Sequence, residues 1–181
     1  MAAFNTITPP TGVPVTVQEL KDRLRITSNA ENGRLYGLLE AAAQWAEDFT
    51  GAYIMPRGIE LTMDRFPARE FTLGVWPIVS VDSVIYDSAD SPSVSTTVAA
   101  SEYELDLVTV KGRIRAVNGW PSTSTKVNAV RIRMTVGYSS KLTVPEGVKE
   151  GIKLYAAGLY YCDDAMREAA KNTLWNYRVV V

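Results

Sequence analysis

Apolar residues recur with helical spacing in the first third of the chain. In residues 16–24 a short apolar stripe follows Thr16 and Glu19, which have the spacing of a capping box. In residues 28–51 the same box recurs, and large apolar side chains follow it at i, i+3, i+4 and i+7. These patterns predict two helices, the second ended by a glycine. In the second helix the capping box is Ser28 and Glu31, and the terminating glycine is Gly51. The apolar stripe is Leu35, Leu38, Leu39, Ala42, Trp45, Ala46 and Phe49.

From residue 57 the hydrophobic period changes to two. Five stretches alternate apolar and polar side chains, and the segments between them are rich in turn and breaker residues. The alternation is typical of strands with one buried face. It predicts an antiparallel sheet of five or six strands, folded into a small sandwich or half-barrel. The five stretches are residues 58–66, 79–86, 102–108, 112–117 and 129–138.

Helical spacing returns after Pro145 and continues to Cys162, with Val148, Ile152 and Leu159 among the residues on one side. Three glycines would weaken this helix in isolation, which indicates that another backbone approaches it closely. They are Gly147, Gly151 and Gly158. The last stretch predicts a fourth helix and a tail whose residue types are favoured at interfaces. The tail residues are Leu174, Trp175, Tyr177 and Arg178.

These elements place the chain in the α+β class. We expect the N-terminal and C-terminal helices to pack as a small bundle, with the antiparallel β domain inserted between them. The helical domain covers residues 15–56 and 142–181, including the C-terminal tail, and the inserted β domain covers residues 57–141. Residues 1–14, rich in proline, glycine and threonine, are expected to be a flexible N-terminal segment.

Composition narrows the function classes. The chain has 181 residues, of which 46% are hydrophobic, and its 19 Lys and Arg against 20 Asp and Glu give a net charge of -1. A near-neutral chain has no global attraction for nucleic acid or for an anionic membrane. No stretch approaches the roughly 18 apolar residues of a membrane span, and the N-terminus lacks the regions of a signal peptide. We expect a soluble protein with no membrane partner.

Histidine is absent altogether. Its absence excludes Ser-His-Asp and Cys-His relays, a histidine general base and a histidine metal ligand. The best remaining acidic cluster is Glu102, Glu104 and Asp106, which alternate along a predicted strand. A divalent-metal enzyme that uses these carboxylates is one alternative, and a solvated or salt-bridged strand face is the other. We predict no enzyme activity and no cofactor.

Charge is unevenly distributed along the predicted sheet. From Asp82 to Val110 there are six acids and no base, whereas Lys111 to Lys141 contains seven bases and no acid. Three interpretations are open: pairing of the blocks inside one molecule, a head-to-tail contact between copies, or a patch that faces DNA. For a contact between copies, the candidate residues are Glu102, Glu104, Asp106, Arg113, Arg115, Arg131 and Arg133.

Five motifs follow one another along the chain: AEDFTGAYIMPRGIELTMDRFP, LGVWPIVSVDSVIYD, YELDL followed by GRI, GWP leading to NAVRIRMTVGY, and VPEGVKEGIKLYAAGLYY. Their order resembles the head-tail connector, or adaptor, family of long-tailed bacteriophages and gene transfer agents. The resemblance covers roughly residues 14–178. It implies a non-enzymatic virion protein of the neck, made in the host cytoplasm, that forms a ring beneath the portal, usually a dodecamer. Such a ring extends the DNA channel and docks a stopper or tail-terminator protein.

The resemblance also implies roles for particular segments. The C-terminal residues Leu174, Trp175, Tyr177 and Arg178 would dock onto the portal, and double-stranded DNA would pass without sequence recognition. Arg131 and Arg133 would face neighbouring strands, a neighbouring subunit or solvent. The polar loop at residues 87–101 departs from the family pattern. A monomeric β-sandwich binding module with helical arms remains the alternative from another class.

Overall fold

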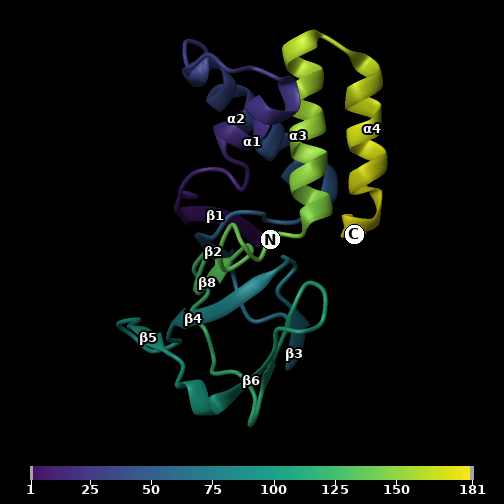
Figure 1. Cartoon of the computed structure of the whole chain (residues 1–181). Coiled ribbons are helices and arrows are strands. Elements are labelled where there is room, and N and C mark those ends of the chain that lie inside the picture. The colour runs from purple at the N-terminus through teal and green to yellow at the C-terminus, as the bar shows by residue number, and fades with distance from the viewer. Residues whose placement is uncertain (1, 180–181) are drawn as a thin grey trace. The chain divides into compact units, whose positions relative to one another are not determined.

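The computed structural model describes residues 2–179 and contains two compact units. The β unit comprises the N-terminal residues as far as Pro10 together with Pro56–Gly137, and the helical unit comprises Thr11–Met55 and the residues from Tyr138 onward (Figure 1). The predicted α+β class is confirmed, because helices from both ends of the chain pack together and antiparallel sheets form between them.

The β unit is built from two antiparallel sheets. The larger sheet has the strand order β1-β2-β8-β4-β5 and the smaller one β3-β7-β6 (Figure 1). Their strands are β1 (Ala2–Thr8), β2 (Arg57–Met63), β3 (Glu70–Thr72), β4 (Ile78–Asp87), β5 (Ser95–Thr97), β6 (Tyr103–Asp106), β7 (Arg113–Ala116) and β8 (Val130–Val136). The five predicted alternating stretches correspond to β2, β4, β6, β7 and β8.

Strand β8 lies at the centre of the larger sheet, between β2 and β4. Its apolar residues Val130, Ile132, Met134 and Val136 are all fully buried. The alternate residues point to the other face, where Arg133 lies directly opposite Glu60 of β2. The hydrophobic face predicted for this stretch is therefore confirmed.

The prediction of a flexible segment over residues 1–14 is wrong for residues 2–8. These residues form β1, which pairs antiparallel with β2 in a register that sets Phe4 opposite Leu61. Phenylalanine, threonine and isoleucine favour strands, and Pro9, which cannot donate a backbone hydrogen bond, follows the strand directly. The segment is too short and too exposed for its alternation to stand out, so its partner strand decides its structure.

Two further strands were not predicted. β3 and β5 have three residues each and lie in segments that are rich in turn residues. A strand of three residues shows less than two periods of alternation, so periodicity cannot detect it. The stretch predicted at residues 102–108 forms a strand only over β6, because residues Ala100–Glu102 adopt a short 3-10 turn.

The helical unit contains α1 (Val17–Leu24), α2 (Asn32–Thr50), α3 (Glu146–Tyr161), α4 (Asp164–Leu174) and a 3-10 turn at Trp175–Tyr177. The capping box of α1 is confirmed: the Thr16 amide donates to Glu19 Oε2 at 2.7 Å, and the Glu19 amide donates to Thr16 Oγ1 at 3.2 Å. The second predicted box is wrong. Ser28 Oγ accepts from the Ala30 amide at 3.1 Å and closes a turn, so α2 begins four residues later.

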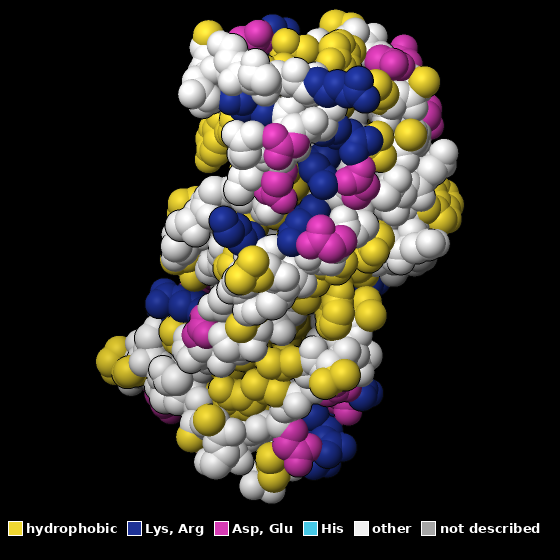
Figure 2. All heavy atoms as spheres, viewed as in Figure 1, with side chains coloured by type: hydrophobic (Ala, Val, Ile, Leu, Met, Phe, Trp, Pro, Cys, Tyr) yellow, Lys and Arg dark blue, Asp and Glu magenta, His cyan; other side chains and the backbone are white. Residues whose placement is uncertain are grey.

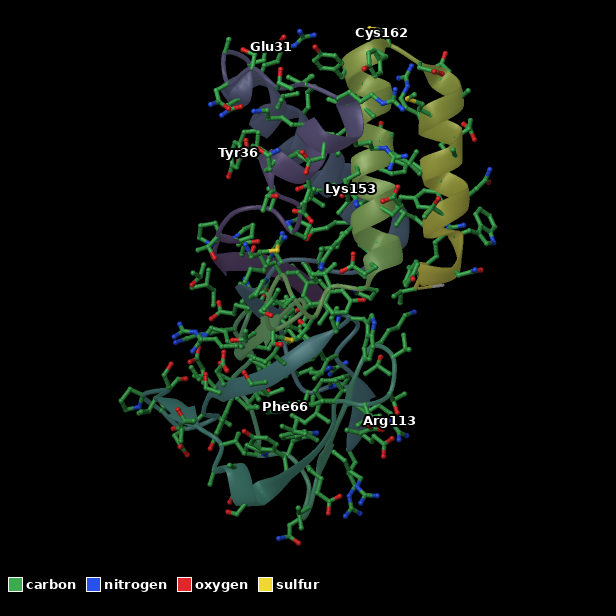
Figure 3. The ribbon with its side chains drawn as sticks, in the orientation of Figure 1. Glu31, Tyr36, Phe66, Arg113, Lys153 and Cys162 are labelled. Carbon is green, nitrogen blue, oxygen red and sulfur yellow. The ribbon has the colours of Figure 1, made fainter. Side chains whose placement is uncertain are left out.

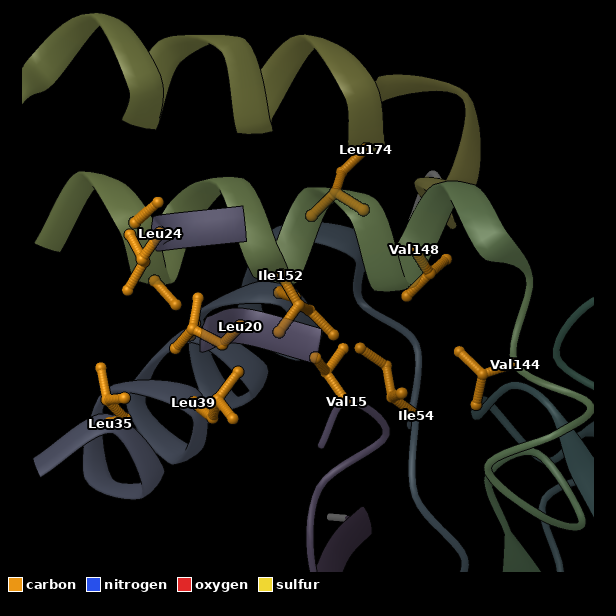
Figure 4. Packing of buried hydrophobic residues seen from close by; sticks show 14 residues of the cluster. Val15, Leu20, Leu24, Leu35, Leu39, Ile54, Val144, Val148, Ile152 and Leu174 are labelled. Carbon is orange, nitrogen blue, oxygen red and sulfur yellow. The ribbon is translucent and has the colours of Figure 1, made fainter. Parts of the chain in front are cut away.

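The helices enclose one apolar core, seen from close by in Figure 4. The predicted stripe of α2 supplies Leu35, Leu39, Ala42 and Ala46 to it, all fully buried. Leu20 of α1 and Ile152 of α3 pack into the same core. Among the described residues, none of the helices is both long enough and apolar enough to cross a membrane.

The glycines of α3 form the face on which α4 packs. A Cβ at Gly151 would lie 2.6 Å from Leu174 Cγ, and a Cβ at Gly147 would lie 2.4 Å from the Tyr177 hydroxyl. At Gly158 the nearest backbone atom, the carbonyl oxygen of Asp163, would be 3.0 Å away. The predicted approach of another backbone is confirmed at Gly158, whereas at Gly147 and Gly151 the close neighbours are the side chains of Tyr177 and Leu174.

Candidate functional site

The acidic cluster predicted as a possible metal site is already paired with arginines. Glu104 and Asp106 on β6 lie opposite Arg115 and Arg113 on β7. Arg113 Nη2 lies 2.7 Å from Asp106 Oδ2, and Arg115 forms an ion pair with Glu104. Hydrogen bonds from Thr109 and Arg113 hold the pKa of the Asp106 carboxyl well below its usual range.

Glu102 does not join this pair, because it lies on the 3-10 turn before β6. Arg113 also approaches Glu70 of β3, with 3.2 Å between Nη1 and Oε1 (Figure 3). The smaller sheet therefore carries a face of alternating charges. Within residues 2–179 no group of three or more His, Cys, Asp or Glu side chains is arranged to hold a metal ion.

The arginines of β8 also have partners inside the β unit. Arg131 Nη2 donates to Asp87 Oδ1 and to Ser95 Oγ, each at 2.8 Å. Hydrogen bonds to the Asp87 carboxylate from Arg131 and from the Ser95 hydroxyl lower the pKa of Asp87 to about 2. Arg133 Nε donates to Glu60 Oε2 at 2.9 Å. Of the three interpretations of the charge blocks, these contacts correspond to pairing inside one molecule.

The acidic and basic residues that were considered together as candidates for a contact between copies lie in different sheets. Arg131 and Arg133 belong to the larger sheet, whereas Glu104 and Asp106 belong to the smaller one. The sign of the charge changes from one strand to the next, so acids of β6 face arginines of β7, and Glu60 of β2 faces Arg133 of β8. A role of these residues between copies stays a prediction.

The four predicted C-terminal residues divide into an inward pair and an outward pair. Leu174 is fully buried and Tyr177 is half-buried against α3. Trp175 is 61% exposed, and the Arg178 guanidinium lies 4.9 Å from its ring centroid. The same guanidinium lies 5.2 Å from the ring centroid of Phe49 on α2. Only Trp175 and Arg178 are therefore available to a partner.

An aromatic cluster in the β unit was not predicted as a unit. Trp120 stacks on Phe66 with 4.4 Å between ring centroids, and Trp120 Nε1 donates to the Ala68 carbonyl oxygen at 2.9 Å. Phe71 and Tyr103 approach the same indole at centroid distances of 5.9 and 6.4 Å. Figure 3 labels Phe66 among these side chains. The GWP motif was the available signal, since a tryptophan between glycine and proline fixes a loop against a sheet.

A groove of about 1060 Å³ opens in the β unit beside β1. Ala2, Phe4, Leu61 and Met63 line one side of it, all from the same face of the larger sheet. Its other lining residues come from β3, from the loops next to β2 and β3, and from the loop before β8: Asp64, Arg65, Pro67, Phe71, Thr72, Leu73, Gly74, Thr123, Ser124, Thr125 and Lys126. The groove holds no catalytic constellation, but its wall is apolar and its rim is partly basic.

Charges on the helical unit are paired as well. Lys153 Nζ of α3 lies 2.8 Å from Glu150 Oε2, and Arg23 of α1 forms an ion pair with the same carboxylate. Lys149 Nζ lies 2.7 Å from Glu146 Oε1. Figure 2 shows the consequence on the viewed face, where basic and acidic side chains lie side by side and do not form large areas of one sign.

Comparison with known proteins gives one family and several structures. Residues 14–72 match the family model described as "Phage gp6-like head-tail connector protein". No curated protein matches the chain in sequence. A chain from the neck of an empty GTA particle, computed with C6 symmetry, is 25% identical with a TM-score of 0.81, over 99% of this chain and 96% of that one.

Two further solved chains have the same fold. One comes from the virion of a native gene transfer agent particle and is 25% identical, with a TM-score of 0.81 over 98% of this chain and 96% of that one. The other comes from the neck of a native GTA particle computed with C12 symmetry. It is 24% identical, with a TM-score of 0.77 over 99% of this chain and 96% of that one.

Proposed function

We propose that this chain, a head-tail connector protein of the phage gp6-like family and of the kind found in the neck of gene transfer agent particles, forms a ring beneath the portal. In that position it extends the DNA channel and docks the next neck or tail component, a stopper or tail-terminator protein. The family is structural, so the chain is a virion component and not an enzyme.

One observation carries the proposal. The similarity to a neck chain extends over 99% of this chain and 96% of the other, at a TM-score of 0.81 and 25% identity. Both units are therefore present in the two chains, and few residues of either chain remain unmatched. A stand-alone β-sandwich module that had borrowed one unit would match over part of its length only.

The ring is supported by the symmetry of the particles that contain the similar chains. Those necks were computed with C6 and with C12 symmetry, which are both compatible with twelve copies around one axis. Heterologous contacts between identical copies close into a ring when the rotation between neighbours divides the circle evenly. We propose a dodecamer for this chain on the same basis.

The exposed pair Trp175 and Arg178 is the proposed docking point for the portal. Tryptophan and arginine are the residue types that contribute most binding energy at interfaces. Here the arginine stacks on Trp175 and Phe49, so both side chains are held in place before any partner arrives. Leu174 and Tyr177 support this surface from inside and do not reach a partner themselves.

The test of the ring uses this chain and the portal protein of the same particle. The two purified proteins are mixed, and the complex is examined by native mass spectrometry and electron microscopy. The expected result is a ring of many copies on one end of the portal. The portal is included because many ring components assemble only on their template. A chain that remains monomeric and unbound in its presence would refute the proposal.

The test of the docking point compares single substitutions. Trp175→Ala and Arg178→Ala should each weaken portal binding, by about tenfold or more for a loss of at least 1.4 kcal/mol. Tyr36→Ala is the matched control, since Tyr36 is an aromatic residue of the same unit with 40% exposure (Figure 3). Equal binding by all three variants would place the portal contact elsewhere.

A further inference from the structure

The larger sheet has two open edges. β1 ends it on one side and β5 on the other. An edge strand presents backbone N–H and C=O groups with no partner in its own sheet, and these groups can pair with a strand from another chain. All seven residues of β1 are exposed, and so are the three residues of β5. Neither strand contains a charged residue or a proline.

The smaller sheet provides the contrast within the same molecule. Its edge strands are β3, which carries Glu70, and β6, which carries Glu104 and Asp106. Charges on an edge strand are a common protection against pairing with other chains. The smaller sheet has this protection and the larger one lacks it. The two edges of the larger sheet are therefore the ones suited to pairing.

We propose that the five-stranded sheet continues from one copy of this chain to the next, with β1 of one copy pairing with β5 of its neighbour. The proposal rests on the proposed ring and adds the strands that join its subunits. The contact is head-to-tail, since it uses two different surfaces of each copy, and such contacts can close into a ring.

The strand directions are compatible with this contact between β1 of one copy and β5 of the next, the joint between subunits. All four pairings within the larger sheet are antiparallel, so β1 and β5 run in the same direction. A small rotation between neighbouring copies nearly preserves orientation, and it brings β1 and the neighbour's β5 together as parallel strands. A two-fold contact of β1 with itself would instead be antiparallel. The two arrangements can be distinguished by experiment.

The apolar face of the sheet continues across the joint. Residues directly opposite in a ladder share a face, and Phe4 is opposite Leu61, Leu61 opposite Ile132, and Ile132 opposite Val84. Phe4 therefore lies on the buried face of the sheet although it is 43% exposed itself.

The same reasoning places Val94 on that face. Tyr86, two residues after Val84, is opposite Thr96, and Val94 stands two residues before Thr96. The Val94 carbonyl oxygen accepts from the Ser88 amide at 2.9 Å, so the pairing of β5 extends to it. Val94 is 58% exposed. At the joint, Val94 of one copy would lie on the same apolar face as Phe4 of the next.

Charge complementarity also supports a second copy of this chain as the partner of β1. In a parallel joint the loop before β5, which holds the exposed Asp90, comes to the N-terminal end of the neighbour's β1. Arg65 and Lys126, both exposed, line the groove at that end, because β2 ends there beside Ala2. The exposed Asp64 lines the same rim, so the acidic loop would meet two basic side chains and one acidic one.

Cysteine cross-linking tests the joint. In a Cys162→Ser background, which removes the single natural cysteine, one set of variants carries Ala3→Cys, Asn5→Cys or Thr8→Cys on β1. A second variant carries Thr97→Cys on β5, which shares the outer face with Ala3. Each variant is oxidised alone and then as a mixture, in both cases in the presence of the portal protein on which the ring is expected to assemble. The three positions on β1 allow for the unknown register.

The expected result is a disulfide-linked dimer in a mixture of one β1 variant with the β5 variant, and none in either variant alone. Thr96→Cys is the matched control, since its side chain lies on the opposite face and should not cross-link with the β1 set. Cross-linking of a β1 variant with itself would mean a two-fold contact and would overturn the proposal. So would the absence of any cross-link in all three mixtures.

A second measurement separates this proposal from the ring itself. Phe4→Lys places a charge on the unprotected edge and should prevent ring assembly on the portal, as a lysine does on protected edge strands. Val127→Lys, at a site 79% exposed in a loop, should leave assembly unchanged. If Phe4→Lys forms normal rings, the joint is wrong and the ring stands. If the unmodified chain forms no ring on the portal, the proposed function fails.

Discussion

Leu174 is the residue through which the C-terminal segment stabilises the helical unit, and Leu174→Ala tests this. The side chain is fully buried and its Cγ lies over Gly151, where even a Cβ would come within 2.6 Å. Truncation of a buried leucine costs about 2.7–5.0 kcal/mol, depending on how far the site collapses. We expect at least about 3 kcal/mol, because a rigid glycine face on α3 cannot move in to fill the space.

Urea denaturation followed by far-ultraviolet circular dichroism measures this loss, since the helices of the chain are in one unit. With a slope of about 1.5 kcal/mol per molar urea, 3 kcal/mol lowers the midpoint by about 2 M. Trp175→Ala is the control on the next residue. Its side chain is 61% exposed, so we expect less than about 1 kcal/mol. Equal midpoints for the two variants would refute the packing argument.

A second substitution at the same contact sharpens the test. Gly151→Ala alone forces a Cβ against Leu174 and should destabilise the unit, because overpacking costs about 1–3 kcal/mol while the helix gains about 1 kcal/mol from alanine. In the Leu174→Ala background the clash is gone, so the same change should stabilise. A change of sign between the two backgrounds is the expected result. Additive effects would show that the residues do not touch.

Three shorter predictions concern the charges. The pKa of Asp87 is lowered to about 2 from an ordinary value of about 4, so its contribution to stability is present above about pH 4 and is lost as the pH falls toward 2. Asp87→Asn should remove that part of the pH dependence in urea titrations. Arg133→Glu should lower the urea midpoint and Glu60→Arg should restore part of it, since the two side chains form one pair across β2 and β8. Addition of Mg²⁺ or EDTA should leave the melting temperature unchanged, and a metal-dependent rise would revive a carboxylate metal site.

The sequence predicted those parts of the fold in which a long pattern repeats. Helix α2 and strand β8 each bury one face, and the spacing of their apolar residues reports that face directly. The glycines of α3 also gave correct information, since a helix with three glycines needs a close neighbour to explain them. In each case the residues that carry the signal are the ones that make the contact.

The remaining elements depend on contacts that no local pattern records. β1 is exposed on both faces and is a strand only because β2 has an edge to which it can pair. The Ser28 box failed because the serine bonds to a nearer amide and closes a turn first. The charge blocks could be counted from the sequence, but which acid meets which arginine depends on the strand order. Arg131 finds Asp87 because β4 and β8 are neighbours, although 44 positions separate the two residues.

Arginines that are already paired with carboxylates are poorly suited to bind DNA phosphates. To bind a phosphate, Arg131 would have to leave Asp87 and Ser95, to which it donates at 2.8 Å, and hydrogen bonds to charged groups contribute about 1.5–3 kcal/mol. Arg133 and Arg113 are held in the same way by Glu60 and Asp106. Each phosphate contact that does form adds salt-dependent affinity, and a strongly bound duplex could not slide. In the proposed ring, basic side chains that are already neutralised by the chain's own carboxylates would bind a passing duplex weakly.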